Sequence, residues 1–310
     1  MASVFSQSCG PMPAAGDGGT DGGGNGDASS GAVTGTFRVA LVAPTMMTPG
    51  QTTVVGRIQN GESPSQIIWT EAMRSGDCAL VTPRVPSCTP GCGSSAACVA
   101  DNTCQPYPTA QNAGTVTITG LGASPITLVS AANSYQLPAG TTLAYPPFAD
   151  GAALSLAIGG AGAIPAMSVT GTAIAPLAVT SQNLMVAAST AVNLTWTAGA
   201  AASDARIKVK LDISHHGGTR GMITCDTADD GSLEIAAPLV TALVSLGVAG
   251  FPSIVVTRER ASSAAAMPSV KMLVVSDVEQ YVTVPGVRSC TTDDDCMGNG
   301  RCRDDLTCGS

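Results

Sequence analysis

The sequence predicts an all-β protein, made of one or two antiparallel β-sandwiches of immunoglobulin-like character. The 36 glycines and 20 prolines among 310 residues favour short strands joined by turns over helices. Short β-type runs recur from Gly35 onward with turn residues between them. Apolar residues make up 44% but aromatics only 3%, so the core must consist of small aliphatic side chains. A core of this kind favours additional covalent links, and the chain has 11 cysteines.

The clearest single element is a β-hairpin over residues 206–226. Apolar and charged residues alternate from Arg206 onward, which is the period of a strand with one buried and one wet face. Gly217 and Gly218 supply the turn. On the return strand Cys225 shares the inward face, so the hairpin is expected to carry this cysteine into the core.

The remaining elements follow the same patterns. Residues 238–246 predict a short helix, with proline at its start and Gly247 as its stop. Residues 151–203 lack charge, but prolines, glycines and hydroxyl residues divide them into pieces too short to span a membrane, so buried strands are predicted there. Strands are expected at residues 36–42, 52–58, 66–70, 115–119, 126–129, 153–158, 167–173, 183–187, 192–197, 232–235, 253–258, 270–276 and 279–284.

Four segments follow from these patterns. Residues 1–34 are a disordered Gly/Asp-rich tether, and residues 35–180 are the first part of the β-sandwich structure, with a cysteine-rich insert at 78–104. Residues 181–287 form the second part, in the same domain or a separate one, and residues 288–310 form a cysteine-rich knuckle.

Cys9 is the predicted site of lipidation. It is followed through Gly31 by glycine, aspartate, alanine and serine, a composition that behaves as a solvated linker. Mature bacterial lipoproteins continue in this way after their acylated cysteine, which predicts an anchor in the outer membrane. Residues 1–8 are too short and polar for a signal peptide, so the hypothesis needs an upstream start or a trimmed one. The alternative is an ordinary disordered tail with an incidental cysteine.

The ten cysteines after Cys9 are all predicted to be disulfide-bonded. Four cysteines allow three connectivities, and interleaved pairing is favoured because crossed loops constrain a short segment most. A pair of zinc knuckles is the alternative, which is disfavoured because neither cluster has the C-x2-C pairs that tetrahedral sites prefer. The predicted pairs are Cys88 with Cys98, Cys92 with Cys104, Cys290 with Cys302, Cys296 with Cys308, and Cys78 with Cys225.

Four stretches together resemble the surface lipoproteins of the myxobacterial type. They are Cys9 with its tether, the insert CTPGCGSSAACVADNTC, the hairpin LDISHHGGTRGMITCD and the terminal CTTDDDCMGNGRCRDDLTC. The resemblance implies a protein of the cell envelope or the extracellular space, and it implies no activity. Of the four stretches, only the cysteine modules are specific to this type of lipoprotein. The sequence departs from the type in lacking a signal sequence before Cys9.

Five residues are weak candidates for a metal site, namely His215, His216, Asp226, Asp229 and Asp230. Two imidazoles at a hairpin tip are suitable metal ligands, but neighbours on a strand point to opposite faces. The aspartates lack the alternate spacing and terminal glutamate of an EF-hand loop. The sequence therefore predicts no metal site and no cofactor.

The sequence does not predict an enzyme. Ser214 lies beside the histidines, but the chain has no G-x-S-x-G elbow and no H-E-x-x-H motif. A net charge of -8 with no basic run excludes a nucleic-acid partner.

The predicted function is therefore that of a non-enzymatic, surface-anchored or secreted lipoprotein with a structural or protein-binding role. The alternative is a carbohydrate-binding accessory module of a secreted system, which would need exposed rings such as Trp69 or Tyr135. Both tryptophans lie in apolar strand patterns and are expected in the core.

Overall fold

Strands make up nearly all of the regular structure in this computed structural model. It describes residues 32–45, 48–199, 204–264, 269–298 and 300–309, which belong to one compact unit. The predicted all-β class is confirmed, together with the disulfide-stapled insert and the C-terminal knuckle. No helix in the described part of the chain is long and apolar enough to cross a bilayer. Cys9 lies outside the described residues.

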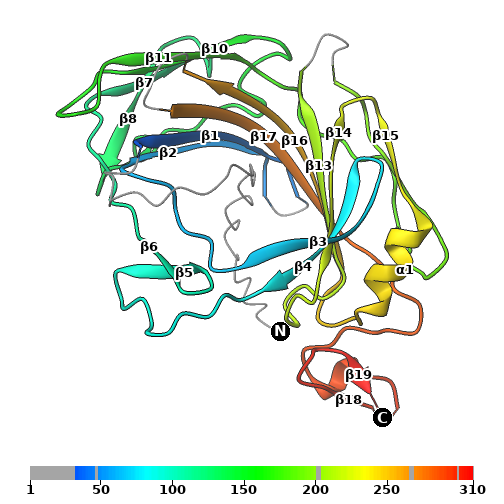
Figure 1. The fold of residues 1–310 in the computed structure, drawn as a ribbon. Coiled ribbons are helices and arrows are strands. Elements are labelled where there is room, and N and C mark those ends of the chain that lie inside the picture. Colours follow the sequence, from blue (N-terminus) through cyan, green and yellow to red (C-terminus); the bar gives the residue numbers. More distant parts are fainter. Residues whose placement is uncertain (1–31, 46–47, 200–203, 265–268, 299, 310) are drawn as a thin grey trace. The chain divides into compact units, whose positions relative to one another are not determined.

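Most elements follow one another closely along the chain, with long connections between β9 and β10 and between β11 and β12 (Figure 1). The helices are α1 Ala237–Ser245 and the 3-10 turn η1 Asp293–Asp295. The strands are β1 Thr34–Val42, β2 Gln51–Gln59, β3 Ile68–Ser75, β4 Cys78–Arg84, β5 Ala96–Ala100, β6 Thr103–Pro106, β7 Val116–Thr119, β8 Ile126–Ala131, β9 Ser134–Gln136, β10 Ala153–Ile158, β11 Met167–Thr172, β12 Val192–Thr195, β13 Arg206–Asp212, β14 Met222–Ala228, β15 Ser232–Ile235, β16 Ser253–Ser263, β17 Ser269–Tyr281, β18 Arg301–Cys302 and β19 Cys308–Gly309.

One sheet joins 13 of the described strands, in the order β11-β10-β7-β8-β9-β2-β1-β17-β16-β13-β14-β4-β3. Strands from both sides of residue 180 therefore share the same sheet. The pairs are antiparallel except β1 with β17, which run parallel in the register Thr34 to Ser269. Three further pairs, β12-β15, β5-β6 and β18-β19, form separate two-stranded ribbons in the described chain.

The inward side chains of the sheet form two hydrophobic clusters. The first core is built mainly from β1, β2, β7 to β11 and the first half of β17, with Phe37 and Leu156 fully buried. The second is built from β4, β12 to β16 and α1, with Leu211 and Leu239 fully buried. The long strands β16 and β17 run side by side past both cores, and these strands tie the two cores into one framework (Figure 1).

The outward face of the same sheet carries charge. Lys208 on β13 lies 3.2 Å from Glu259 on β16, and Arg206 lies 2.8 Å from Asp226 on β14. Each pair joins neighbouring strands, as cross-strand side chains on one face do. The alternation that predicted the hairpin therefore corresponds to a buried core on one face and these ion pairs on the other.

The central hairpin is confirmed as β13 and β14. Residue Val209 pairs with Cys225, and Cys225 in turn lies directly opposite Cys78 on β4. Both cysteines are buried. The predicted helix is confirmed as α1, which packs Leu239, Val240 and Leu243 into the second core.

Two sequence predictions about strands were wrong. Residues 183–187 form no strand, because their ladder is limited to one residue, with Val186 N–H donating to Thr283 O and Thr283 N–H donating to Leu184 O. The two strands expected at 270–276 and 279–284 are largely one, since Asp277 continues the ladder opposite Thr257 instead of turning. Several strands, among them β4, β5, β6 and β9, were not predicted. β4 is identified as a strand by its partners in the sheet more than by its own pattern.

A buried ion pair lies on the inward face where the two cores meet. β16 places Ile254 and Val256 in the second core, and Arg258 follows them with 1% exposure. Arg258 Nε lies 2.7 Å from a carboxylate oxygen of Asp229, whose side chain is equally buried. The other oxygen of Asp229 accepts hydrogen bonds from Arg258 at 3.0 Å and from Trp196 Nε1 at 2.8 Å.

The same guanidinium also links loops that belong to neither long strand. It donates to the carbonyl oxygens of Ala175 at 3.2 Å and Thr197 at 2.5 Å. A buried guanidinium needs all of these acceptors, because unpaired donors are costly away from water. Arg258 therefore fixes two connecting segments relative to β16.

Candidate functional site

The most distinctive surface feature is the cystine hairpin, which we define as residues 84–107 with β5 and β6 at its centre. Within it Ala97 and Pro86 are buried, while most other side chains are partly or fully exposed. So few apolar contacts cannot hold a fold, and a segment of this kind depends on covalent links. In the structure Cys88 bonds to Cys98 and Cys92 to Cys104, which are the pairings that interleaving predicted.

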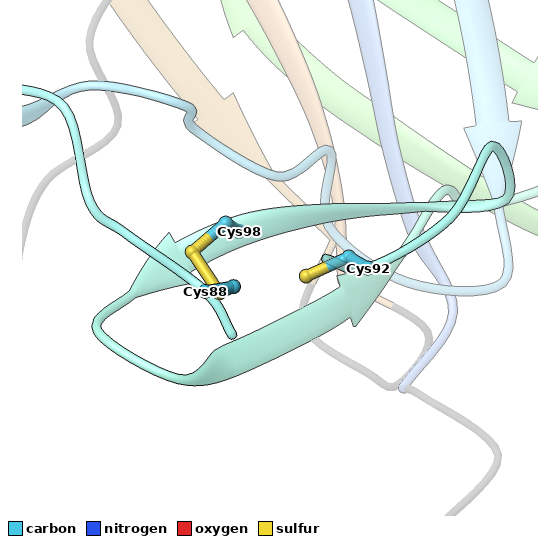
Figure 2. Close-up of side chains that lie close together, drawn as sticks. All are labelled: Cys88, Cys92 and Cys98. Carbon is cyan, nitrogen blue, oxygen red and sulfur yellow. A yellow bond between two sulfur atoms is a disulfide. The ribbon is translucent and has the colours of Figure 1, made fainter. Parts of the chain in front are cut away.

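The sulfur atoms of the cystine hairpin lie unusually close to one another. The Sγ atoms of Cys88, Cys92 and Cys98 are all within 4.8 Å of each other. Figure 2 shows the Cys92 side chain directed toward the Cys88–Cys98 bond. The two disulfides are therefore stacked near one point between the strands of the hairpin.

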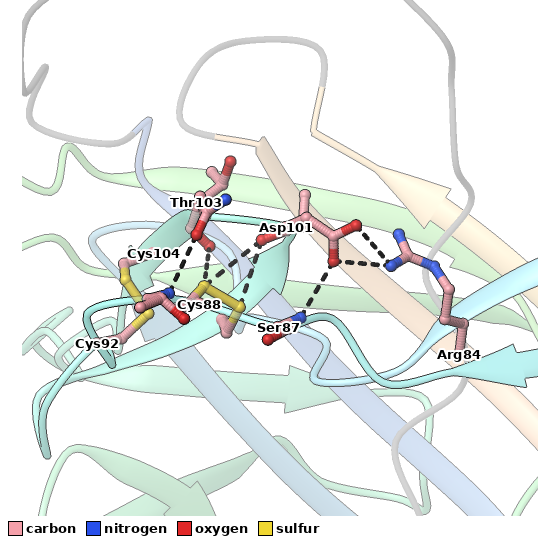
Figure 3. The surroundings of a disulfide bond; sticks show 11 residues. Arg84, Ser87, Cys88, Cys92, Asp101, Thr103 and Cys104 are labelled. Atoms are coloured by element: carbon pink, nitrogen blue, oxygen red, sulfur yellow. Dashed lines mark hydrogen bonds and ion pairs between the residues drawn. A yellow bond between two sulfur atoms is a disulfide. The ribbon is translucent and has the colours of Figure 1, made fainter.

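An ion pair joins the first residue of the cystine hairpin to the turn between β5 and β6. One nitrogen of Arg84 lies 2.7 and 2.8 Å from the two oxygens of Asp101, and Ser87 N–H donates to the same carboxylate at 3.1 Å (Figure 3). The Ser87 N–H and then the Arg84 guanidinium hold the pKa of the Asp101 carboxyl below its ordinary value. This interaction is complete above about pH 4, the ordinary range of aspartate, and is lost as the pH falls through the lowered pKa.

Polar contacts attach the cystine hairpin to the rest of the chain. Gln66 Nε2 donates to the Tyr107 hydroxyl at 3.0 Å, and Gln105 Nε2 donates to Glu62 O at 2.8 Å. The sequence did not identify Arg84 and Asp101 as part of this module. Asp101 lies between two cysteines of the insert, but its pairing with a residue 17 positions away follows only from the folded hairpin.

The C-terminal knuckle repeats the crossed arrangement of two disulfides. Cys290 bonds to Cys302 and Cys296 to Cys308, as predicted. The knuckle meets the body of the protein at Gly250, whose N–H donates to Asp305 O at 2.6 Å and whose carbonyl accepts from the Ser289 hydroxyl at 2.6 Å. Unlike the cystine hairpin, the knuckle buries one of its bonded cysteines almost completely, with Cys290 at 1% exposure.

The histidine pair differs from its predicted arrangement. His215 and His216 lie beyond the end of β13, and their ring centroids are 3.9 Å apart, so the expectation that they point to opposite faces was wrong. The reason is that His216 adopts a left-handed backbone with φ 63° in the turn. Burial, and secondly His216, lower the pKa of His215.

The three aspartates of the predicted weak metal set are engaged separately. Asp226 pairs with Arg206 on the sheet surface, Asp229 is buried against Arg258, and Asp230 accepts the N–H of Ser232 in a turn. Over the described ranges, groups of three or more potential ligands within 4.8 Å occur only at Cys88, Cys92, Cys98 and at Cys290, Cys296, Cys308. Those sulfurs are bonded in disulfides, and the structure does not bring the histidines and aspartates together as one ligand set.

Ser214 makes no triad with the neighbouring histidines. Its hydroxyl and its N–H both donate to Asp212, at 3.1 and 2.9 Å, and both residues are buried. Thr219 donates to the other oxygen of the same carboxylate at 3.0 Å. Asp212 therefore organises the hairpin turn directly, without an imidazole between acid and hydroxyl as nucleophilic catalysis requires.

Among the described aromatic side chains, Phe37, Tyr135 and Trp196 are buried, and Tyr107 and Tyr281 are exposed. Trp196 lies in the second core and donates to Asp229, as expected of a core tryptophan. Tyr135, one of the rings considered for sugar stacking, is 1% exposed and its hydroxyl accepts the N–H of Ala113. Trp69 is only partly buried on β3, so its expected place in the core was wrong, because β3 is the last strand of the sheet.

Comparison with known proteins identifies no family. No protein-family model matches the chain, and no curated protein matches it. Among solved structures, the crystal structure of murine CEACAM1b matches 81% of this chain and 99% of its own, with 9% sequence identity and a TM-score of 0.16. A TM-score this low does not indicate a shared fold. The fold class of this protein follows from the sheet described above.

Proposed function

We propose that this protein is a non-enzymatic protein of the cell surface or extracellular space that presents the cystine hairpin to a protein partner. The observation that carries the proposal is an exposed segment whose shape is fixed before binding by two crossed disulfides and the Arg84–Asp101 pair. A preorganised segment loses little conformational freedom on binding, which improves affinity at a given contact area.

The two ends of the cystine hairpin display the side chains that protein interfaces use. Val85 is 75% exposed and Tyr107 is 44% exposed, and Ile67, next to the Gln66 that binds the Tyr107 hydroxyl, is 40% exposed. Tyrosine and aliphatic side chains surrounded by polar residues are typical of a binding surface. This composition supports a protein partner more than a glycan, for which stacked rings would be needed.

The compartment is supported by the cysteines. All ten cysteines in the described part of the chain are joined in disulfides, a usage typical of secreted and surface proteins. Lipid anchoring at Cys9 is part of the proposal and rests on the composition of the tether that follows it.

Lipidation is tested in cells that export the protein behind a bacterial lipoprotein signal sequence. Metabolic labelling with an alkyne fatty acid is expected to tag the protein, and Cys9→Ser is expected to abolish the tag and release the protein from the membrane fraction. Ser8→Ala is the matched control and should retain both. A Cys9→Ser protein that stays labelled and sediments with membranes would reject the anchor.

Protein binding is tested by photo-crosslinking in the producing cells. A benzophenone amino acid at Ser94, exposed in the turn that precedes β5, is expected to give one discrete protein adduct. The same group at the exposed Ser232 on β15 is the control and should give none. Equal adducts at both positions, or none at Ser94, would count against the proposed role.

The carbohydrate alternative predicts a different result. A glycan array would show a specific polysaccharide that is lost on Trp69→Ala, since Tyr135 is buried and cannot stack on a sugar. Such binding without a Ser94 adduct would favour the alternative over the protein-binding role.

A further inference from the structure

The five disulfides of the described chain differ in solvent access. The Cys78–Cys225 bond is buried, with its residues 1% and 4% exposed. By contrast Cys104, on the edge of the cystine hairpin, is exposed, and it is the only exposed cysteine in the part of the chain that the structure describes. A reductant in solution is therefore expected to reach the Cys92–Cys104 bond first, from the side of Cys104.

Breaking that bond at Cys104 leaves the Cys92 sulfur as a thiolate beside the second disulfide of the hairpin, Cys88–Cys98. The Cys92 Sγ lies within 4.8 Å of both sulfurs of the Cys88–Cys98 bond, and its side chain is directed toward them (Figure 2). Thiol–disulfide exchange requires a thiolate near a disulfide sulfur, and a tethered thiolate acts at an effective concentration on the order of millimolar.

The surroundings of the second bond favour its opened form at equilibrium, once the leaving cysteine is protonated. The carbonyl oxygen of Ala100 lies 3.3 Å from Cys98 Sγ and 3.6 Å from Cys88 Sγ, and Thr103 O lies 3.6 Å from Cys88 Sγ (Figure 3). A neutral thiol formed at either sulfur has an acceptor in place, whereas a thiolate there is repelled by the carbonyl dipoles. A thiol released at Cys88 or Cys98 is thus favoured to pick up a proton and stay neutral.

We propose that the cystine hairpin is a thiol–disulfide exchange site for dithiols, with Cys104 as the point of entry and Cys92 as the relay to Cys88–Cys98. A dithiol thiolate attacks Cys104 Sγ and forms a mixed disulfide, and Cys92 leaves as a thiolate. The second thiol of the reductant attacks its own sulfur in the mixed disulfide, and Cys104 leaves as a thiol. The reductant becomes an intramolecular disulfide.

The relay step conserves the number of disulfides. The Cys92 thiolate attacks one sulfur of Cys88–Cys98 and bonds to it, and the other cysteine leaves and takes up a proton. Overall the dithiol loses two electrons and two protons, and the protein gains one thiol at Cys104 and one at Cys88 or Cys98. This reactivity is separate from the binding role proposed above and does not depend on it.

The test uses the oxidised full-length protein with one molar equivalent of dithiothreitol, followed by alkylation with N-ethylmaleimide and peptide mapping. The relay predicts label on Cys104 and on Cys88 or Cys98, with Cys92 found in a new disulfide. Label on Cys92 and Cys104 in equal amounts would overturn the relay. Label appearing first in the knuckle or at Cys78 and Cys225 would overturn Cys104 as the entry point.

A variant measures the relay by rate. In Cys92→Ser/Cys104→Ser the Cys88–Cys98 bond remains, and its opening by about 0.1 mM dithiothreitol is expected to slow severalfold, because the exposed entry bond and the tethered thiol are both gone. The knuckle bonds in the same molecule are the internal control and should keep their rate. An unchanged rate for Cys88–Cys98 would overturn the relay, and the mapping of the unmodified protein decides the question even if this variant folds poorly.

Discussion

Replacing Asp229 with alanine is expected to lower the free energy of unfolding by about 3 to 5 kcal/mol, the cost of leaving one partner of a buried ion pair behind. Arg258 would then keep a buried charge whose only carboxylate contact in the described structure is gone. Trp196 Nε1 would lose its acceptor as well. Urea unfolding followed by circular dichroism measures the change.

The neighbouring aspartate provides the control. Asp230 is exposed and accepts one N–H in a turn, so Asp230→Ala should change stability by no more than about 0.5 kcal/mol. The double variant Asp229→Ala/Arg258→Met removes the orphaned charge and is expected to recover part of the loss. A single Asp229→Ala variant as stable as Asp230→Ala would show that the buried ion pair does not stabilise the fold.

Removing the Cys78–Cys225 bond in a Cys78→Ala/Cys225→Ala variant is expected to cost about 5 kcal/mol, since it joins residues 147 positions apart. That figure is the chain-entropy value for so long a loop. For a domain of this size it corresponds to a fall in Tm of roughly 10 to 20 °C, measurable by differential scanning calorimetry. Both cysteines lie in the second core, so alanine also leaves a small cavity and adds to the loss.

Truncation after Val287 is the matched comparison. It removes two disulfides, but each closes a loop with a separation of 12 within the knuckle itself. The knuckle joins the body mainly through the two hydrogen bonds at Gly250. Truncation should therefore lower Tm much less than the double alanine variant, and an equal loss would show that the long-range bond is not a principal restraint of the fold.

Most of the correct structural predictions came from the spacing of residues within single segments. Alternation along residues 206–213 identified β13 and its buried face, and Pro238 and Gly247 bracketed α1. The crossed pairing of the cysteines followed from their spacing, because short segments with almost no apolar residues need covalent links. These features are local, so the sequence carries them directly.

Some strand assignments could not be predicted from the pattern of neighbouring residues. The segment at 183–187 was expected to be a strand, yet its hydrogen-bond partner is the single residue Thr283. β4 was missed because its partners lie on β3 and β14. Strand identity in these places depends on hydrogen bonds to distant residues.

The sequence by itself therefore determined the all-β class, the central hairpin, the short helix and the disulfide modules, because strand and turn periodicity and cysteine spacing are properties of neighbouring residues. Only the tertiary structure decided that Asp229 is the buried partner of Arg258 and that Cys92 points at the Cys88–Cys98 bond. Both arrangements bring together groups from different elements, and their distances are set by how the strands pack.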